Sequence, residues 1–136
     1  MATTTIPDRF LATLTSKKAL AHLATVMPDG SPQVTPVWFL YDKDSGRFIV
    51  NTARGRVKDR NMTQNGRVAL SIVDPDNPYS HISVRGRISR VTEEGADANI
   101  DTLAQKYLGQ PKYPGRRPGE VRVMYEIEPT SISAMG

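Results

Sequence analysis

The chain has 136 residues, of which 38% are hydrophobic and 24% are charged, as is typical of one globular domain. It contains no cysteine, which excludes disulfide bonds, a thiolate nucleophile and a cysteine-based zinc site. The formal net charge of +4, from 18 Lys and Arg against 14 Asp and Glu, is too small to indicate a nucleic-acid partner by itself.

The hydrophobic pattern predicts six strands and two or three short helices. In chain order, the expected strands cover residues 19–27, 32–42, 47–52, 67–74, 81–91 and 121–129. The expected helices cover residues 7–18, 56–65 and 93–108. Gly86 interrupts the alternation of apolar and polar residues in the fifth strand, which indicates a β-bulge. Because short turns join most of the strands, we expect an antiparallel sheet that closes into a barrel.

The ends of the chain and its histidines carry few functional signals. His22 and His81 are far apart and belong to no metal-binding motif, so we expect no metal site. Residues 1–14 lack the basic and apolar regions of a signal peptide. No apolar run approaches the roughly 18 residues that a membrane-spanning helix needs. We therefore expect one cytoplasmic domain over residues 1–136 that binds no membrane.

Residues 51–61, NTARGRVKDRN, contain the densest group of cations in the chain. The cations alternate with other residues at Arg54, Arg56, Lys58 and Arg60. If residues 56–60 are helical, Arg56 and Arg60 lie one turn apart on the same face. A helix N-terminus carries a partial positive charge, so cations there are unfavourable unless an anion binds beside them. A bound phosphate would relieve this repulsion, and the alternative is a solvated basic face.

Three further segments are compatible with either a functional or a structural role. Residues 34–39 contain the only tryptophan, Trp38, which would contact a flat aromatic ligand or pack in a core or subunit interface. Residues 77–81, NPYSH, offer a phenol, a hydroxyl and an imidazole for proton donation, or simply end a loop. The loop at residues 113–122 carries cations that would bind a second anionic group or form an exposed connector, namely Arg116, Arg117 and Arg122.

The chain resembles one known family, the pyridoxamine 5′-phosphate oxidase-like (PPOX class) family with the FMN-binding split barrel. The resemblance rests on six segments, which read PDGSPQVTPVWF, VNTARGRVKDRN, RVALSIVDPDNPY, VRGRI, KYLG and YPGRRPGEVRV. Within the family these segments most resemble the actinobacterial branch that uses the deazaflavin coenzyme F420. The resemblance implies a mainly β fold, a six-stranded antiparallel split β-barrel with short flanking helices, that forms a homodimer with cofactors at the subunit interface.

The resemblance also implies which residues bind the cofactor. In relatives one strand runs along the isoalloxazine or deazaflavin ring, a basic segment binds the phosphate, and a loop approaches the cofactor, often from the partner subunit. The corresponding positions here are Pro36, Val37 and Trp38 for the ring, Arg56 and Lys58 for the phosphate with Asn51, Thr52, Arg60 and Asn61 beside them, Tyr79 and Ser80 in the loop, and Arg122 in a late strand.

The function that the resemblance implies is an F420-dependent oxidoreductase, in which reduced F420 transfers a hydride to an unsaturated organic acceptor. The chain departs from the pyridoxamine phosphate oxidases proper, which have a longer C-terminal segment with a basic substrate-phosphate motif, so vitamin B6 oxidation is not expected. Three alternatives stay open: an FMN-binding flavoprotein of the same fold, a non-catalytic F420 carrier, and a small barrel that binds nucleic acid. The low aromatic content of 7% argues against the last. No catalytic residue is assigned.

Overall fold

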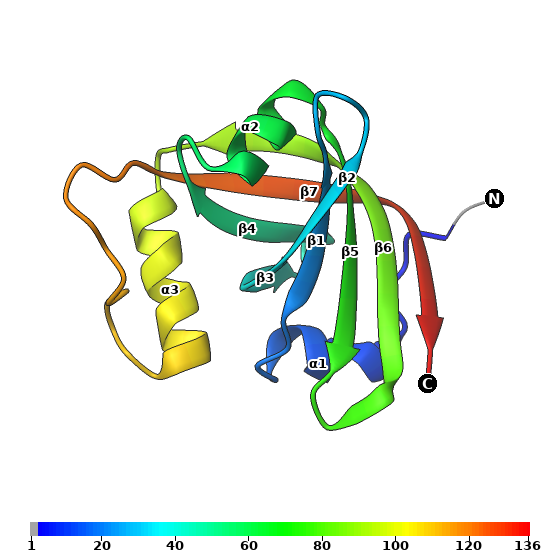
Figure 1. The fold of residues 1–136 in the computed structure, drawn as a ribbon. Helices are drawn as coiled ribbons and strands as arrows, with labels where there is room; N and C mark the ends of the chain where they lie inside the picture. The colour runs from blue at the N-terminus through cyan, green and yellow to red at the C-terminus, as the bar shows by residue number, and fades with distance from the viewer. Residues whose placement is uncertain (1–2) are drawn as a thin grey trace.

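Seven antiparallel strands form one strongly curled sheet in a computed structural model, which describes residues 3–136 (Figure 1). The strands are β1 (Ala21–Val26), β2 (Pro32–Val37), β3 (Phe39–Asp42), β4 (Arg47–Ala53), β5 (Arg67–Asp74), β6 (Asn77–Thr92) and β7 (Arg122–Met135). Their order in the sheet is β2-β1-β5-β6-β7-β4-β3. The α-helices are α1 (Leu11–Thr15), which follows a 3-10 turn at Asp8–Phe10, α2 (Val57–Gln64) and α3 (Ala96–Leu108).

The predicted second strand, residues 32–42, is divided at Trp38 into two strands. β2 pairs with β1, whereas β3 pairs with β4, so these consecutive strands lie at opposite edges of the sheet. The sheet curls until the two edges approach, and the chain crosses from one edge to the other at Trp38. The strand count is therefore seven rather than six, because the partner of each half is set by long-range pairing.

Other element boundaries differ from the sequence prediction in length. The first helix is shorter than expected, since α1 ends at Thr15, and the last strand continues to Met135. The β-bulge at Gly86 is confirmed, because the pairing of β6 with β7 shifts register between Arg85 and Gly86. A Cβ atom at Gly86 would lie 2.8 Å from the Glu128 carbonyl oxygen, so glycine allows the two strands to approach closely there.

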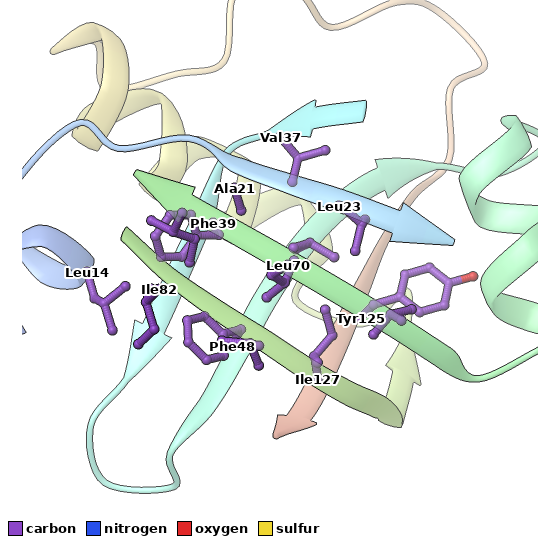
Figure 2. Packing of buried hydrophobic residues seen from close by; sticks show 14 of the residues in the cluster. Leu14, Ala21, Leu23, Val37, Phe39, Phe48, Leu70, Ile82, Tyr125 and Ile127 are labelled. Atoms are coloured by element: carbon purple, nitrogen blue, oxygen red, sulfur yellow. The ribbon is translucent and has the colours of Figure 1, made fainter. Parts of the chain in front are cut away.

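The main core fills the inside of the curled sheet (Figure 2). Alternate residues of the strands point inward, as the buried Leu70 on β5 and Ile82 on β6 illustrate, and Leu14 of α1 covers one end. Each fully buried side chain of this kind contributes about 1.5–3 kcal/mol relative to exposure. The core thus provides a rigid frame for the polar residues at its rim.

A smaller apolar cluster lies beneath α3, which stands beside the sheet (Figure 1). The apolar face predicted for this helix is confirmed, and the helix ends at Gly109, whose φ of 69° is left-handed. Trp38 stacks on Tyr107 of α3 with ring centroids 5.2 Å apart and planes 4° apart. Its ring also meets the edge of Tyr113. These contacts fix the chain at the point where it crosses between the sheet edges.

Candidate cofactor-binding site

A cleft of about 310 Å³ opens where the β2–β3 crossing, the start of α2 and one side of α3 meet. It is lined by Leu20, Pro36, Val37, Trp38, Asn51, Arg56, Lys58, Ile100, Leu103, Tyr113 and Arg122. Seven of the twelve residues that the family resemblance implies therefore come together here: Pro36, Val37, Trp38, Asn51, Arg56, Lys58 and Arg122. The apolar residues of the cleft come from the β2–β3 crossing, from α3 and from Leu20, and Arg56, Lys58 and Arg122 contribute three cations.

The start of α2 presents two of these cations and a free helix N-terminus. Arg56 is the N-cap residue in extended conformation (ψ 159°), and no side chain caps the helix. The N–H groups of the first turn thus have no intrahelical acceptor. The helix begins at Val57, so Arg56 is its N-cap residue, and the N–H of Arg60 one turn later donates to the Arg56 carbonyl. Arg56 and Lys58 line the cleft, whereas Arg60 is exposed outside it.

Lys58 is a partly buried cation without a counter-ion. Within residues 3–136 no carboxylate lies within 4.0 Å of its ammonium group. Burial lowers its pKa below the usual 10.5, and the charges of Arg56 and Arg122 lower it further. Glu120 is the carboxylate that pairs with both arginines, at 3.6 Å and 3.0 Å respectively. The cleft therefore holds an excess of positive charge that an anion would neutralise.

Arg122 is held in place by a buried hydrogen-bond network. Its Nε donates to Oδ1 of Asn51 at 2.9 Å, and the Asn51 amide donates to the carbonyl of Ala96 and to Oδ1 of Asn99. The guanidinium lies 5.3 Å from the ring centroid of Tyr113. The network joins β4, β7 and α3, so Arg122 has little freedom to move when a ligand enters.

Asp59, which lies between the cations Lys58 and Arg60 in the sequence, anchors the start of α2. Its carboxylate accepts hydrogen bonds from the Tyr125 hydroxyl at 2.6 Å, the Gly55 N–H at 2.9 Å and the Arg54 guanidinium at 3.0 Å. Arg54 also binds Glu93. Burial would raise the pKa of Asp59, but these hydrogen bonds and the Arg54 charge together hold it below its usual value. Arg54 is thus neutralised and separate from the cleft.

Three predicted residues of the 51–61 segment do not line the cleft. Thr52 is buried on β4, and its hydroxyl has no hydrogen-bond partner in the part of the chain that the structure describes. Asn61 is also buried and donates to the hydroxyl of Thr25, which ties α2 to β1. Arg60 points to solvent.

The predicted loop residues also lie elsewhere within one chain. Tyr79 is 79% exposed, and Ser80 is partly buried beside it, on the β5–β6 hairpin at the end of the sheet away from α2 (Figure 1). Arg116 was a candidate for a second anionic group, but its guanidinium already pairs with Asp97 and Asp101 on α3.

The cleft also contains residues that sequence reasoning missed. They are Leu20, Ile100, Leu103 and Tyr113. The apolar spacing of residues 93–108 predicted that Ile100 and Leu103 share a buried face, and only the fold shows that this face borders the cleft.

Between residues 3 and 136, no three His, Cys, Asp or Glu side chains gather as a metal site would require. No helix in this part of the chain combines the length and apolar character needed to cross a membrane.

Comparisons with known proteins identify relatives along nearly the whole chain. The family model described as pyridoxamine 5′-phosphate oxidase matches residues 7–136. The F420H(2)-dependent biliverdin reductase of Mycobacterium tuberculosis (strain CDC 1551 / Oshkosh) is 32% identical over 127 residues, which cover 93% of this chain and 85% of the relative. The solved structure of an F420 reductase is similar with a TM-score of 0.81 and 33% identity, over 94% of this chain and 98% of that one.

A more distant structure shows how widely the fold is shared. A putative pyridoxamine 5′-phosphate oxidase from Listeria innocua has a TM-score of 0.70 at 20% identity, over 93% of this chain and 95% of that one. These matches confirm the expected split-barrel fold and the expected family resemblance. The chain belongs to the pyridoxamine 5′-phosphate oxidase family, and its relatives include F420-dependent reductases.

Proposed function

We propose that this protein is an F420-dependent oxidoreductase that reduces an unsaturated organic acceptor. The observation that carries the proposal is Lys58, a partly buried cation with no counter-ion among residues 3–136, in a cleft that also has apolar lining. A deazaflavin cofactor has both complementary parts, an anionic phosphate group and a flat ring. Relatives at 32% and 33% identity are named as F420-dependent enzymes, which supports this cofactor.

The residues of the cleft fit the parts of such a cofactor. Lys58 and Arg56 would bind the phosphate together with the uncapped N-terminus of α2. The strand segment Pro36–Trp38 would lie along the ring. When bound, reduced F420 supplies a hydride from C5 of its ring, and the protein provides orientation and electrostatics.

The other residues of the cleft would position the ring and limit its contact with water. Ile100 and Leu103 of α3 form an apolar side, which excludes water from one edge of the ring. Arg122 is already fixed by Asn51, so it would bind without loss of side-chain freedom. Asn51 therefore acts by positioning Arg122.

We further propose that a second copy of the chain completes the site, as the family resemblance implies. The β5–β6 hairpin carries the exposed Tyr79 and the partly buried Ser80, and neither residue lines the cleft of its own chain. In a homodimer this hairpin would approach the cofactor of the partner subunit. Titration of the purified protein by light scattering at increasing concentration would detect the dimer, and a protein that stays monomeric when bound to cofactor would contradict this part.

The proposal is tested by separate titrations with F420 and with FMN, followed by the fluorescence of each cofactor. We expect tight F420 binding, weaker FMN binding, and turnover of reduced F420 with an unsaturated acceptor, with biliverdin as the first compound to try because a relative reduces it. Tighter binding of FMN would select the flavoprotein alternative. Binding of F420 without turnover of any conjugated acceptor would select the carrier alternative.

Nucleic-acid binding is the least supported alternative. It required the cations from Arg54 to Arg67 to form one surface, but Arg54 pairs with Asp59 and Glu93, whereas Lys58 lines the cleft. An oligonucleotide that binds with a steep dependence on salt would contradict this conclusion.

A further inference from the structure

A second cleft, of about 480 Å³, adjoins the candidate cofactor cleft. It is lined by Lys18, Ala19, Leu20, His22, Val73, Asp74, Pro75 and Pro78. Leu20 lines both clefts, so a ligand in the second cleft would lie next to a ring in the first. None of the cofactor-binding residues that the family resemblance implies lines this second cleft.

His22 stands at the boundary between the two clefts. On β1 it is the direct cross-strand partner of Pro36, which lines the cofactor cleft, and of Ser71 on β5. Side chains of directly opposed residues have Cβ atoms about 4.5–5.5 Å apart. His22 is exposed and does not lie in the core of this chain.

The hydrogen bond of His22 fixes the chemistry of its ring. Nδ1 lies 3.3 Å from the Ser71 carbonyl oxygen, which only accepts hydrogen bonds, so Nδ1 carries a hydrogen and donates it. Nε2 has no hydrogen-bond partner in the described chain. The strand thus holds an imidazole with one nitrogen anchored and the other available to a ligand.

The remaining wall of the second cleft suits an apolar ligand. Val73, Pro75 and Pro78 provide apolar surface. Asp74, the carboxylate of the cleft, is bound by Lys17, with both carboxylate oxygens 2.9 Å from the ammonium group. The polar side chains left for a ligand are Lys18 and His22, and His22 is the one that is paired across the strands with Pro36 of the cofactor cleft.

We propose that the second cleft binds the acceptor, a conjugated carbonyl compound with an apolar body, and that His22 supplies the proton of the reduction. This inference rests on the proposed function, because the two electrons must come from a reduced deazaflavin in the first cleft. The β-carbon of the acceptor would receive a hydride, the C=C π pair would form a double bond between the α-carbon and the carbonyl carbon, and the C=O π pair would move to the oxygen, which takes the proton from Nε2. The resulting enol rearranges to the saturated carbonyl compound, and solvent returns a proton to Nε2.

Two variants separate this role from a structural one. In His22→Asn the side-chain amide stands where Nδ1 stood and keeps the hydrogen bond to Ser71, but Nε2 is lost. Lys43→Asn is the control, since Lys43 is exposed in the turn after β3 and lines neither cleft. We expect His22→Asn to slow turnover about 100-fold or more, the usual contribution of a general acid, without changing F420 affinity. The control should change neither quantity.

Binding is measured without turnover by NMR of His22. The wild-type protein is loaded with oxidised F420 and titrated with 4-phenylbut-3-en-2-one, a neutral conjugated ketone. The inference predicts that the ring signals of His22 shift and saturate, and that the Lys43→Asn variant shows the same shift. If F420 binds but the ketone leaves the His22 signals in place, or if His22→Asn turns over at the wild-type rate, the inference is wrong while the proposed function stands. Failure of F420 to bind at all would remove the proposed function itself.

Discussion

The hydroxyl oxygen of Tyr125 lies 2.6 Å from Oδ1 of Asp59, directly beneath the first turn of α2. Tyr125 belongs to the main core, and its phenol reaches out of that core toward the helix (Figure 2). The same carboxylate accepts the Gly55 N–H, which fixes the loop before the helix. The position of Lys58, one residue before Asp59, is therefore set by the core of the barrel.

Replacing Asp59 by asparagine should destabilise the protein by about 2–4 kcal/mol at neutral pH, because it leaves buried donors and the Arg54 charge without their acceptor. The folded protein holds the pKa of Asp59 below the ordinary 3.8, so this stabilisation is complete above that pH and is lost as the pH falls through the lower, folded-state pKa. Urea unfolding at about pH 7 and about pH 3 should show the wild-type advantage over Asp59→Asn shrinking in acid.

The matched control is Asp97→Asn, which alters an aspartate whose side chain is 73% exposed. It should change the free energy of unfolding by less than about 0.5 kcal/mol. Equal effects of the two substitutions at neutral pH would mean that Asp59 does not anchor the helix.

Replacing Gly86, at the bulge on β6, by alanine should destabilise the protein more than the same change at Gly66. A Cβ at Gly86 would lie 2.8 Å from both the Glu128 carbonyl oxygen and Cγ2 of Ile127, whereas the nearest atoms to a Cβ at Gly66 are 3.8 Å away. Gly86→Ala should lower the free energy of unfolding by about 1–3 kcal/mol, the usual cost of overpacking. Gly66→Ala should be nearly neutral. Thermal unfolding of the two variants checks this prediction, which equal melting temperatures would refute.

The buried ammonium group of Lys106 should make the free energy of unfolding rise with pH. Its ammonium group donates to the Phe39 carbonyl oxygen at 2.9 Å and lies over the Phe39 ring, and burial lowers its pKa from 10.5 to about 8. Between these two values the unfolded chain binds the proton that the folded protein releases, so folding is favoured as the pH rises. The free energy of unfolding of the wild type relative to Lys106→Met should therefore increase between about pH 7 and about pH 10. A difference that is constant over this range would show that Lys106 has an ordinary pKa.

The fluorescence of Trp38 can report ligand binding in the cofactor cleft, because Trp38 lines this cleft and is the only tryptophan in the chain. A deazaflavin ring that lies along Pro36–Trp38 should quench the tryptophan emission, and quenching should saturate at the same concentration as the fluorescence change of the cofactor. Binding that alters the cofactor signal and leaves the tryptophan emission unchanged would place the ring elsewhere.

Local patterns in the sequence predicted most elements, because alternation and helical spacing reflect burial within one element. They failed at Trp38, where the chain leaves one sheet edge for the other, since nothing in residues 32–42 records which strands pair with each half. The bulge at Gly86 was accessible because it disturbs the alternation within its own strand.

Only some residues of the candidate site could be predicted, because local sequence patterns do not record contacts between distant parts of the chain. Arg56 and Lys58 were found from charge density and family resemblance, and the structure brings both into the cleft. The anchoring role of Asp59 could not be found, because its partner Tyr125 is 66 residues away in the chain. Tyr113 was missed for a similar reason, since it reaches the cleft only when the loop after α3 folds back.

Lys58→Met gives the most direct test of the account, measured as the F420 dissociation constant and the free energy of unfolding of the same variant. Losing a charged hydrogen bond to the phosphate should weaken F420 binding by about 5- to 150-fold, equivalent to about 1–3 kcal/mol. The unliganded variant should be more stable than the wild type, since burial and two neighbouring cations disfavour the charge. This gain should diminish as the pH rises toward 10.5, where the wild-type protein loses the charge as well.

Arg60→Met is the control, because it removes an exposed cation of the same segment outside the cleft. It should leave F420 affinity nearly unchanged. The account predicts weaker F420 binding together with higher stability in Lys58→Met alone. Wild-type F420 affinity in Lys58→Met, or an equal loss of affinity in both variants, would contradict the claim that the unpaired cation in the cleft binds the phosphate.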